Sequence, residues 1–66
     1  MEYVIKLPDG YAGADDQTRW FNPENAERFS DRLAARNEAY LRQCRLGLEA
    51  DEVKIQPLAL AVLLLQ

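Results

Sequence analysis

The sequence contains no histidine and a single cysteine among its 66 residues. Without histidine, most general-base and zinc-binding designs are excluded. Cys44 alone cannot form an internal disulfide, so the covalent support of many small secreted domains is missing. We therefore expect a reduced, cytoplasmic protein with no catalytic residues, no metal ligands and no cofactor.

Long hydrophobic segments are also missing. The longest apolar run is Leu58–Leu65, far below the roughly 20 residues that a membrane-spanning helix requires. Met1–Lys6 lacks the order of charged, apolar and small residues that marks a signal peptide. We expect neither membrane contact nor export.

The residues that are present indicate one small domain, residues 1–66, with 48% apolar residues and a net charge of −3. A chain of this size buries only about 60% of its unfolded surface. Its core must be thin, with no room for a cofactor cavity of several hundred Å³.

The first half of the chain predicts a hairpin. Tyr3, Ile5 and Leu7 would fall on one face of a strand rich in β-branched and aromatic residues, with Glu2, Val4 and Lys6 on the other. Pro8-Asp9-Gly10 has turn chemistry. The returning strand is either Tyr11–Ala14 or Thr18–Phe21. Trp20 and Phe21 are interpreted as buried anchors, although exposed aromatic residues there would favour an interface.

A helix should follow, because Asn22-Pro23-Glu24 combines a cap, a first-turn proline and an acidic residue. It runs either from Pro23 or, after a short turn, from about Asp31, and Gly47 is a plausible end. Its predicted apolar face consists of Ala26, Phe29, Leu33, Tyr40 and Cys44. On that face Cys44 would be a buried structural thiol, and Asn37 at the edge would be a solvated or interface residue.

The last segments predict one or two strands. Val53–Ile55 alternates in polarity, and Leu58–Leu65 is short enough that a strand is favoured over a helix. The expected fold class is α+β in two layers, with one main helix on a small antiparallel sheet, ordered β-β-α-β with or without a further C-terminal strand.

The charge is polarised along the chain. Residues 23–46 carry four acidic and five basic side chains, a net +1, whereas the remainder carries seven acidic and three basic ones, a net −4. Acidic loops can steer a protein toward a basic partner, and simple solubility is the alternative explanation. The predicted partner-binding residues are the loop acids together with Tyr11, which we expect to project from the turn: Asp9, Tyr11, Asp15, Asp16, Glu49, Asp51 and Glu52.

Arginines recur every four residues at Arg28, Arg32 and Arg36. On a helix they would form one stripe, suited to phosphates or to acidic groups of a partner. The overall acidity and the scarcity of lysine argue against direct nucleic-acid binding.

Tyr3-Val4-Ile5-Lys6, Pro8-Asp9-Gly10-Tyr11, Trp20 and Ala26-Glu27-Arg28-Phe29 together resemble a type of very small phage and prophage protein. In that type a hairpin precedes an A-x-R-F element and an N-capped helix, matched here by Ser30-Asp31. The resemblance implies an accessory role. Some small acidic proteins of mobile elements are similar in size and charge and act as anti-CRISPR inhibitors.

The resulting hypothesis is a non-enzymatic inhibitor from a phage or mobile element, such as an anti-CRISPR protein. Its partner would be a larger host complex, such as a CRISPR effector complex, with a basic nucleic-acid-binding surface. Two alternatives stay open: an oligomeric subunit that pairs, for example as a homodimer, through Leu58–Leu65, and a nucleic-acid binder that uses the arginine stripe.

Overall fold

A computed structural model describes residues 1–65 of the chain. Four strands, two α-helices and two short 3-10 helices follow one another as β1 (Tyr3–Leu7), β2 (Gly10–Ala12), β3 (Arg19–Trp20), η1 (Pro23–Asn25), α1 (Arg32–Leu46), η2 (Ala50–Glu52), β4 (Lys54–Pro57) and α2 (Leu58–Leu65). The predicted α+β class, with a main helix on an antiparallel sheet, is confirmed.

The sheet has the order β3-β2-β1-β4, and every neighbouring pair is antiparallel. Pro8 and Asp9 connect β1 to β2, and Gly10 adopts φ 145°, a value that residues with a side chain rarely adopt. Both expected candidates for the returning strand are used, because β2 pairs with β1 and β3 pairs with β2.

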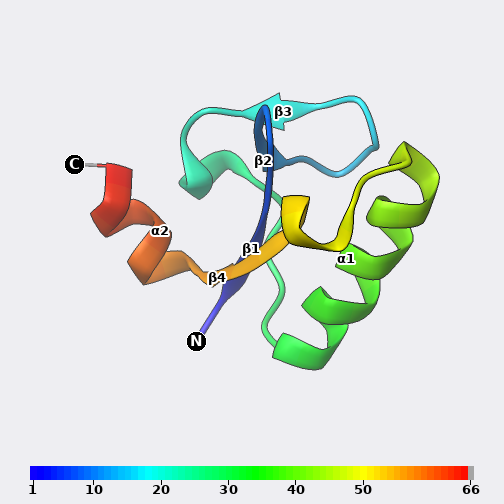
Figure 1. Ribbon diagram of the computed structural model, residues 1–66. Coiled ribbons are helices and arrows are strands. Elements are labelled where there is room, and N and C mark those ends of the chain that lie inside the picture. The colour runs from blue at the N-terminus through cyan, green and yellow to red at the C-terminus, as the bar shows by residue number, and fades with distance from the viewer. Residues whose placement is uncertain (66) are drawn as a thin grey trace.

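The two faces of the sheet are covered differently, with α1 on one side and α2 on the other (Figure 1). Ile5 and Leu7 face α1, where they form a cluster with Ala12 and Ala39. Val4 and Tyr11 face the other side, against Ala26 and Ala61. Strand β1 is therefore covered on both faces, which fits its nearly continuous apolar sequence, interrupted only by Lys6.

The main helix begins at the later of the two expected positions. The Asn22 side chain accepts a hydrogen bond from the Glu24 backbone N–H and caps only the short η1. The Asp31 carboxylate accepts from the Leu33 N–H and caps α1, and Gly47 ends the helix at φ 68°.

The predicted apolar face is wrong for its three members within α1, whereas Ala26 and Phe29, which precede α1, are buried and half-buried. Helix α1 buries Ala35, Ala39 and Arg42, whereas Leu33, Tyr40 and Cys44 are exposed. Large side chains on the sheet, Ile5 and Leu7, already fill the space beneath α1. The helix therefore approaches with small residues, and Cys44 is a surface thiol, not a buried one.

Leu58–Leu65 forms the helix α2, so the preference for a strand is also wrong. Leucine and alanine are strong helix formers, and Val62 is the only β-branched residue in this run. The helix docks through Ala61, which is fully buried, and the Leu58 N–H donates to the Glu2 carbonyl at 2.7 Å. No helix within residues 1–65 is long and apolar enough to cross a membrane.

Candidate functional site: an aromatic groove beside an acidic turn

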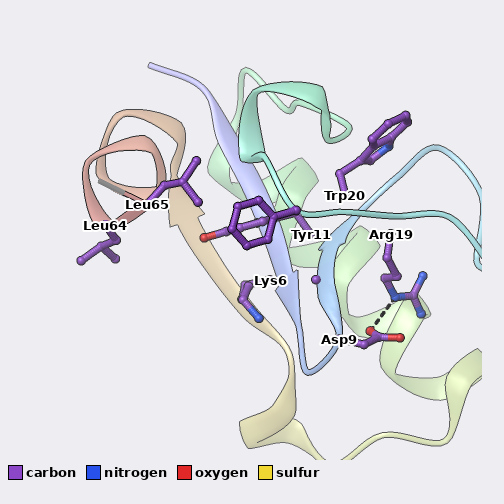
Figure 2. Close-up of a pocket in the computed structure, with 9 residues that line it drawn as sticks. Lys6, Asp9, Tyr11, Arg19, Trp20, Leu64 and Leu65 are labelled. Atoms are coloured by element: carbon purple, nitrogen blue, oxygen red, sulfur yellow. Dashed lines mark hydrogen bonds and ion pairs between the residues drawn. The ribbon is translucent and has the colours of Figure 1, made fainter.

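Three adjacent strands place an aromatic and cationic row across the face of the sheet that carries α2. In the register, Lys6 lies opposite Tyr11, and Tyr11 lies opposite Trp20. Directly opposed residues project from the same face, so these three side chains are neighbours. Figure 2 shows Tyr11 in the middle of the row, with Lys6 beside it.

An open groove of about 330 Å³ runs along this row. Tyr11 forms its floor, and Leu64 and Leu65 approach from the C-terminal turn of α2 (Figure 2). Trp20 and Phe21 line its other side. The lining combines tryptophan, tyrosine and arginine, the residue types that dominate binding energy at protein interfaces.

Tyr11 was expected to project from the turn, and the structure corrects this. Its side chain is buried, and its hydroxyl donates to Gln56 Oε1 at 3.2 Å. The Lys6 ammonium lies 5.6 Å from the centre of the Tyr11 ring and donates to the Leu7 carbonyl. Because Tyr11 belongs to β2 and not to the turn, it supplies a fixed floor instead of a mobile anchor.

Trp20 and Phe21 are not the buried anchors that the sequence suggested. Trp20 is 40% exposed and Phe21 is 83% exposed. Strand β3 has only two residues and lies at the edge of the sheet, so these rings stay exposed within the described part of the chain. Exposed aromatic residues at this position favour an interface, as the sequence indicates.

Asp9 lies at one end of the groove, where its carboxylate pairs with Arg19 at 2.8 Å (Figure 2). The hydrogen bond from Arg19 lowers the pKa of Asp9 below its ordinary value. Asp9 is therefore ionised at neutral pH, but part of its charge is neutralised within the protein.

A second hollow of about 360 Å³ shares Lys6 with the groove as a lining residue. Asp51 and Glu52 of η2 line this hollow together with Lys54. Among residues 1–65, Asp51 and Glu52 form no ion pair. The Glu52 carboxylate accepts from the Glu49 backbone N–H at 2.8 Å, which fixes the turn and leaves the Asp51 carboxylate without such a bond. We call residues 49–52 the acidic turn.

Asp15 and Asp16 do not join this surface. They lie in the loop between β2 and β3, which packs beside the C-terminal half of α1. Asp15 accepts from the backbone N–H groups of Gln17 and Thr18, and Asp16 pairs with Arg45 at 2.7 Å. Hydrogen bonding by the Thr18 side chain, followed by the two backbone bonds, lowers the pKa of Asp15, and the hydrogen bond from Arg45 lowers the pKa of Asp16. These bonds give the two residues a structural role.

Arg42 is the structural residue that the sequence interpretation missed. Its guanidinium is 1% exposed and donates to Glu38, to the Gly13 carbonyl and to the Asp15 carbonyl. Glu38 also accepts from Arg45, and both arginines lower the pKa of its carboxyl. The i,i+4 spacing of Glu38 and Arg42 is typical of an ion pair on a helix, but no sequence signal places the distant loop carbonyls around Arg42.

Of the seven predicted site residues, the groove and its neighbouring hollow therefore collect Asp9, Tyr11, Asp51 and Glu52. Glu49 begins the acidic turn, and Asp15 and Asp16 lie elsewhere. Within residues 1–65, no group of three or more histidine, cysteine or acidic side chains is arranged to hold a metal ion. Comparisons with family models, curated proteins and solved structures give no match for this chain.

Proposed function

We propose that this protein is a non-enzymatic binding protein that acts by contacting a larger protein through the aromatic groove and the acidic turn. The observation that carries the proposal is the exposed pair Trp20 and Phe21 beside a preformed groove floored by Tyr11. Such a groove is ready to receive an apolar side chain of a partner without rearrangement.

The charge supports a basic partner. The protein carries a net charge of −3, and Asp51 on the acidic turn is exposed and forms no ion pair among residues 1–65. Complementary charge raises the rate of association and selects against acidic partners. We include in the proposal that the partner surface is a basic, nucleic-acid-binding one.

The biological setting follows from the resemblance to small phage and prophage proteins. In the proposal, the protein is an inhibitor encoded by a phage or mobile element and works in the bacterial cytoplasm, and the anti-CRISPR class is the best-fitting example. It would block the partner sterically, since binding across a basic surface excludes nucleic acid from it.

The test is affinity capture with the full chain, followed by measurement of binding to the purified partner. Trp20→Ser with Phe21→Ser should weaken binding about a hundredfold, because two exposed interface aromatics are lost. Asp51→Lys should slow association, and Asp51→Asn should have a smaller effect. The matched control is Leu63→Gln, which changes a side chain that is 65% exposed outside the groove lining.

Full binding by the Trp20 and Phe21 double variant would contradict the groove as the contact surface. Unchanged association by Asp51→Lys would contradict the basic partner while leaving the groove intact. Competition between the partner's nucleic acid and the protein tests the inhibitory step, since independent binding of both would exclude steric inhibition.

A further inference from the structure

The outer face of α1 carries a mainly apolar stripe that no other element of residues 1–65 covers. Leu33, Asn37, Tyr40 and Cys44 follow one another at intervals of four, three and four residues, and all four are exposed. Leu33 is 60% and Tyr40 is 64% exposed, and exposed apolar side chains that lie along one helix face mark an interaction surface. We call these four residues the α1 seam.

The α1 seam lies on the side of the helix opposite the buried residues. At 3.6 residues per turn, its four members fall within a narrow sector, and Ala35, Ala39 and Arg42 fall about half a turn away. The helix is therefore amphipathic in an unusual sense. Its small residues face the sheet, and its larger apolar side chains face solvent.

The spacing of the α1 seam is the one by which helices pack on helices. Alternating steps of four and three residues keep a stripe facing a neighbouring helix, and a single asparagine in such a stripe fixes its alignment. The 15 residues of α1 extend about 22 Å, enough to contact three to four turns of another helix.

Unpaired cations border one side of the α1 seam. Within residues 1–65, Arg32 and Arg36 form no ion pair, whereas Glu38 is held by Arg42 and Arg45. Two shallow hollows, of about 480 and 410 Å³, share Arg36 as a lining residue. The third arginine of the predicted stripe, Arg28, precedes α1 and pairs with Glu2 instead.

From this arrangement we propose that the α1 seam binds an acidic amphipathic helix of a partner protein. Apolar side chains of that helix would pack along Leu33 and Tyr40, and its carboxylates would pair with Arg32 and Arg36. A second copy of this chain fits less well, because Glu38, the only carboxylate within α1, is already held by Arg42 and Arg45.

This inference goes beyond the aromatic groove, because the α1 seam lies on the other side of the sheet (Figure 1). A partner on one surface leaves the other open. The protein would thus join two partners, or two parts of one assembly, through separate surfaces.

The test uses the full chain labelled with ¹⁵N and a synthetic helical peptide of about 15 residues, the length of α1. The peptide has leucine along one stripe and glutamate on both borders, and its counterpart has lysine in place of every glutamate. The acidic peptide should bind with amide shifts along α1, and the lysine peptide should bind at least about tenfold more weakly.

Variants locate the binding. Leu33→Gln with Tyr40→Gln should abolish it, and Arg36→Glu should reverse the preference between the two peptides. Leu63→Gln is the matched control because Leu63 is equally exposed, and it should change nothing. Trp20→Ser should also leave peptide binding unchanged. A failure of the proposed α1 seam can therefore be distinguished from a failure of the proposed aromatic groove.

Three results would overturn the proposal. The first is no binding of the acidic peptide, or equal binding of both peptides. The second is a concentration-dependent dimer in sedimentation that Tyr40→Gln dissociates, which would assign the α1 seam to a second copy. The third is binding of a single-stranded oligonucleotide that Arg36→Glu removes, which would assign the arginines to nucleic acid.

Discussion

At the scale of single residues, the protein buries a charged side chain and exposes large aromatic ones, the reverse of the usual distribution. Arg42 is the largest fully buried side chain, whereas Trp20, Phe21 and Tyr40 are exposed. The helix spacing could not reveal this, because Arg42 and its exposed neighbour Arg45 lie on the same helix and both pair with Glu38. The difference is made by the loop carbonyls of Gly13 and Asp15, which reach Arg42 from far along the chain.

Arg42→Ala should destabilise the fold by about 3 kcal/mol, the typical cost of removing one partner from a buried charge network. Two loop carbonyls would lose their donor, and the tie between α1 and the β2–β3 loop would be lost. Urea denaturation measures the change. Arg36→Ala is the exposed control with an expected change close to zero, and equal stability of the two variants would refute a structural role for Arg42.

Gly13→Ala should be destabilising by about 1–3 kcal/mol, as overpacking generally is. A Cβ at this position would lie 2.7 Å from the Thr18 side chain and 3.0 Å from the Trp20 indole nitrogen. Because Trp20 is the only tryptophan, its fluorescence should shift as well. Gly47→Ala, strained at φ 68° but far from any neighbour, should lose stability without that shift; a fluorescence change in both would contradict the local explanation.

At the scale of elements, the hairpin, the caps and the helix end could be predicted, since each depends on residues close in sequence. Pro8-Asp9-Gly10, Asp31 and Gly47 act as their types suggest. The helical state of Leu58–Leu65 and the buried side of α1 could not be predicted in this way. Both depend on packing against the sheet, which involves residues far apart in the sequence. In the candidate site, the residue types of the groove were visible, but the register that aligns Lys6, Tyr11 and Trp20 was not.

The attachment of the β2–β3 loop to α1 should be sensitive to acid. Asp16 and Glu38 accept hydrogen bonds from Arg45 and Arg42, which lower the pKa of both carboxyls in the folded state. Their contribution is therefore complete above the ordinary carboxyl pKa of about 4 and is lost as the pH falls through the lower folded values. The free energy of unfolding should fall over that range.

The control for this prediction is Asp16→Asn combined with Glu38→Gln, which should flatten the acid limb of the stability profile. The double variant should also be less stable than the wild type at neutral pH. An unchanged acid limb in the double variant would show that other carboxyls cause the loss.

The docking of α2 should depend on Ala61. This residue is fully buried against Val4 and Tyr11, so Ala61→Leu should cost about 1–3 kcal/mol through overpacking. Leu63→Ala, at an exposed position of the same helix, should cost far less. Circular dichroism and thermal unfolding would check both, and equal losses would contradict the proposed packing of α2.

At the scale of the whole molecule, a single sheet separates two apolar surfaces (Figure 1). The aromatic groove lies on the side of α2, and the α1 seam lies beyond the other face. This chain of 66 residues buries few of its large apolar side chains, and ten large hydrophobic side chains are exposed among the described residues. That distribution indicates a molecule whose activity lies at its surface.

The most direct test of the groove as the contact surface is amide hydrogen exchange of the full chain, free and bound to the partner obtained by affinity capture. The proposal predicts added protection at β3, at Phe21 and at the acidic turn, with the β2–β3 loop around Asp15 unchanged. Protection confined to the Asp15–Asp16 loop, or absent from Trp20 and Phe21, would contradict it.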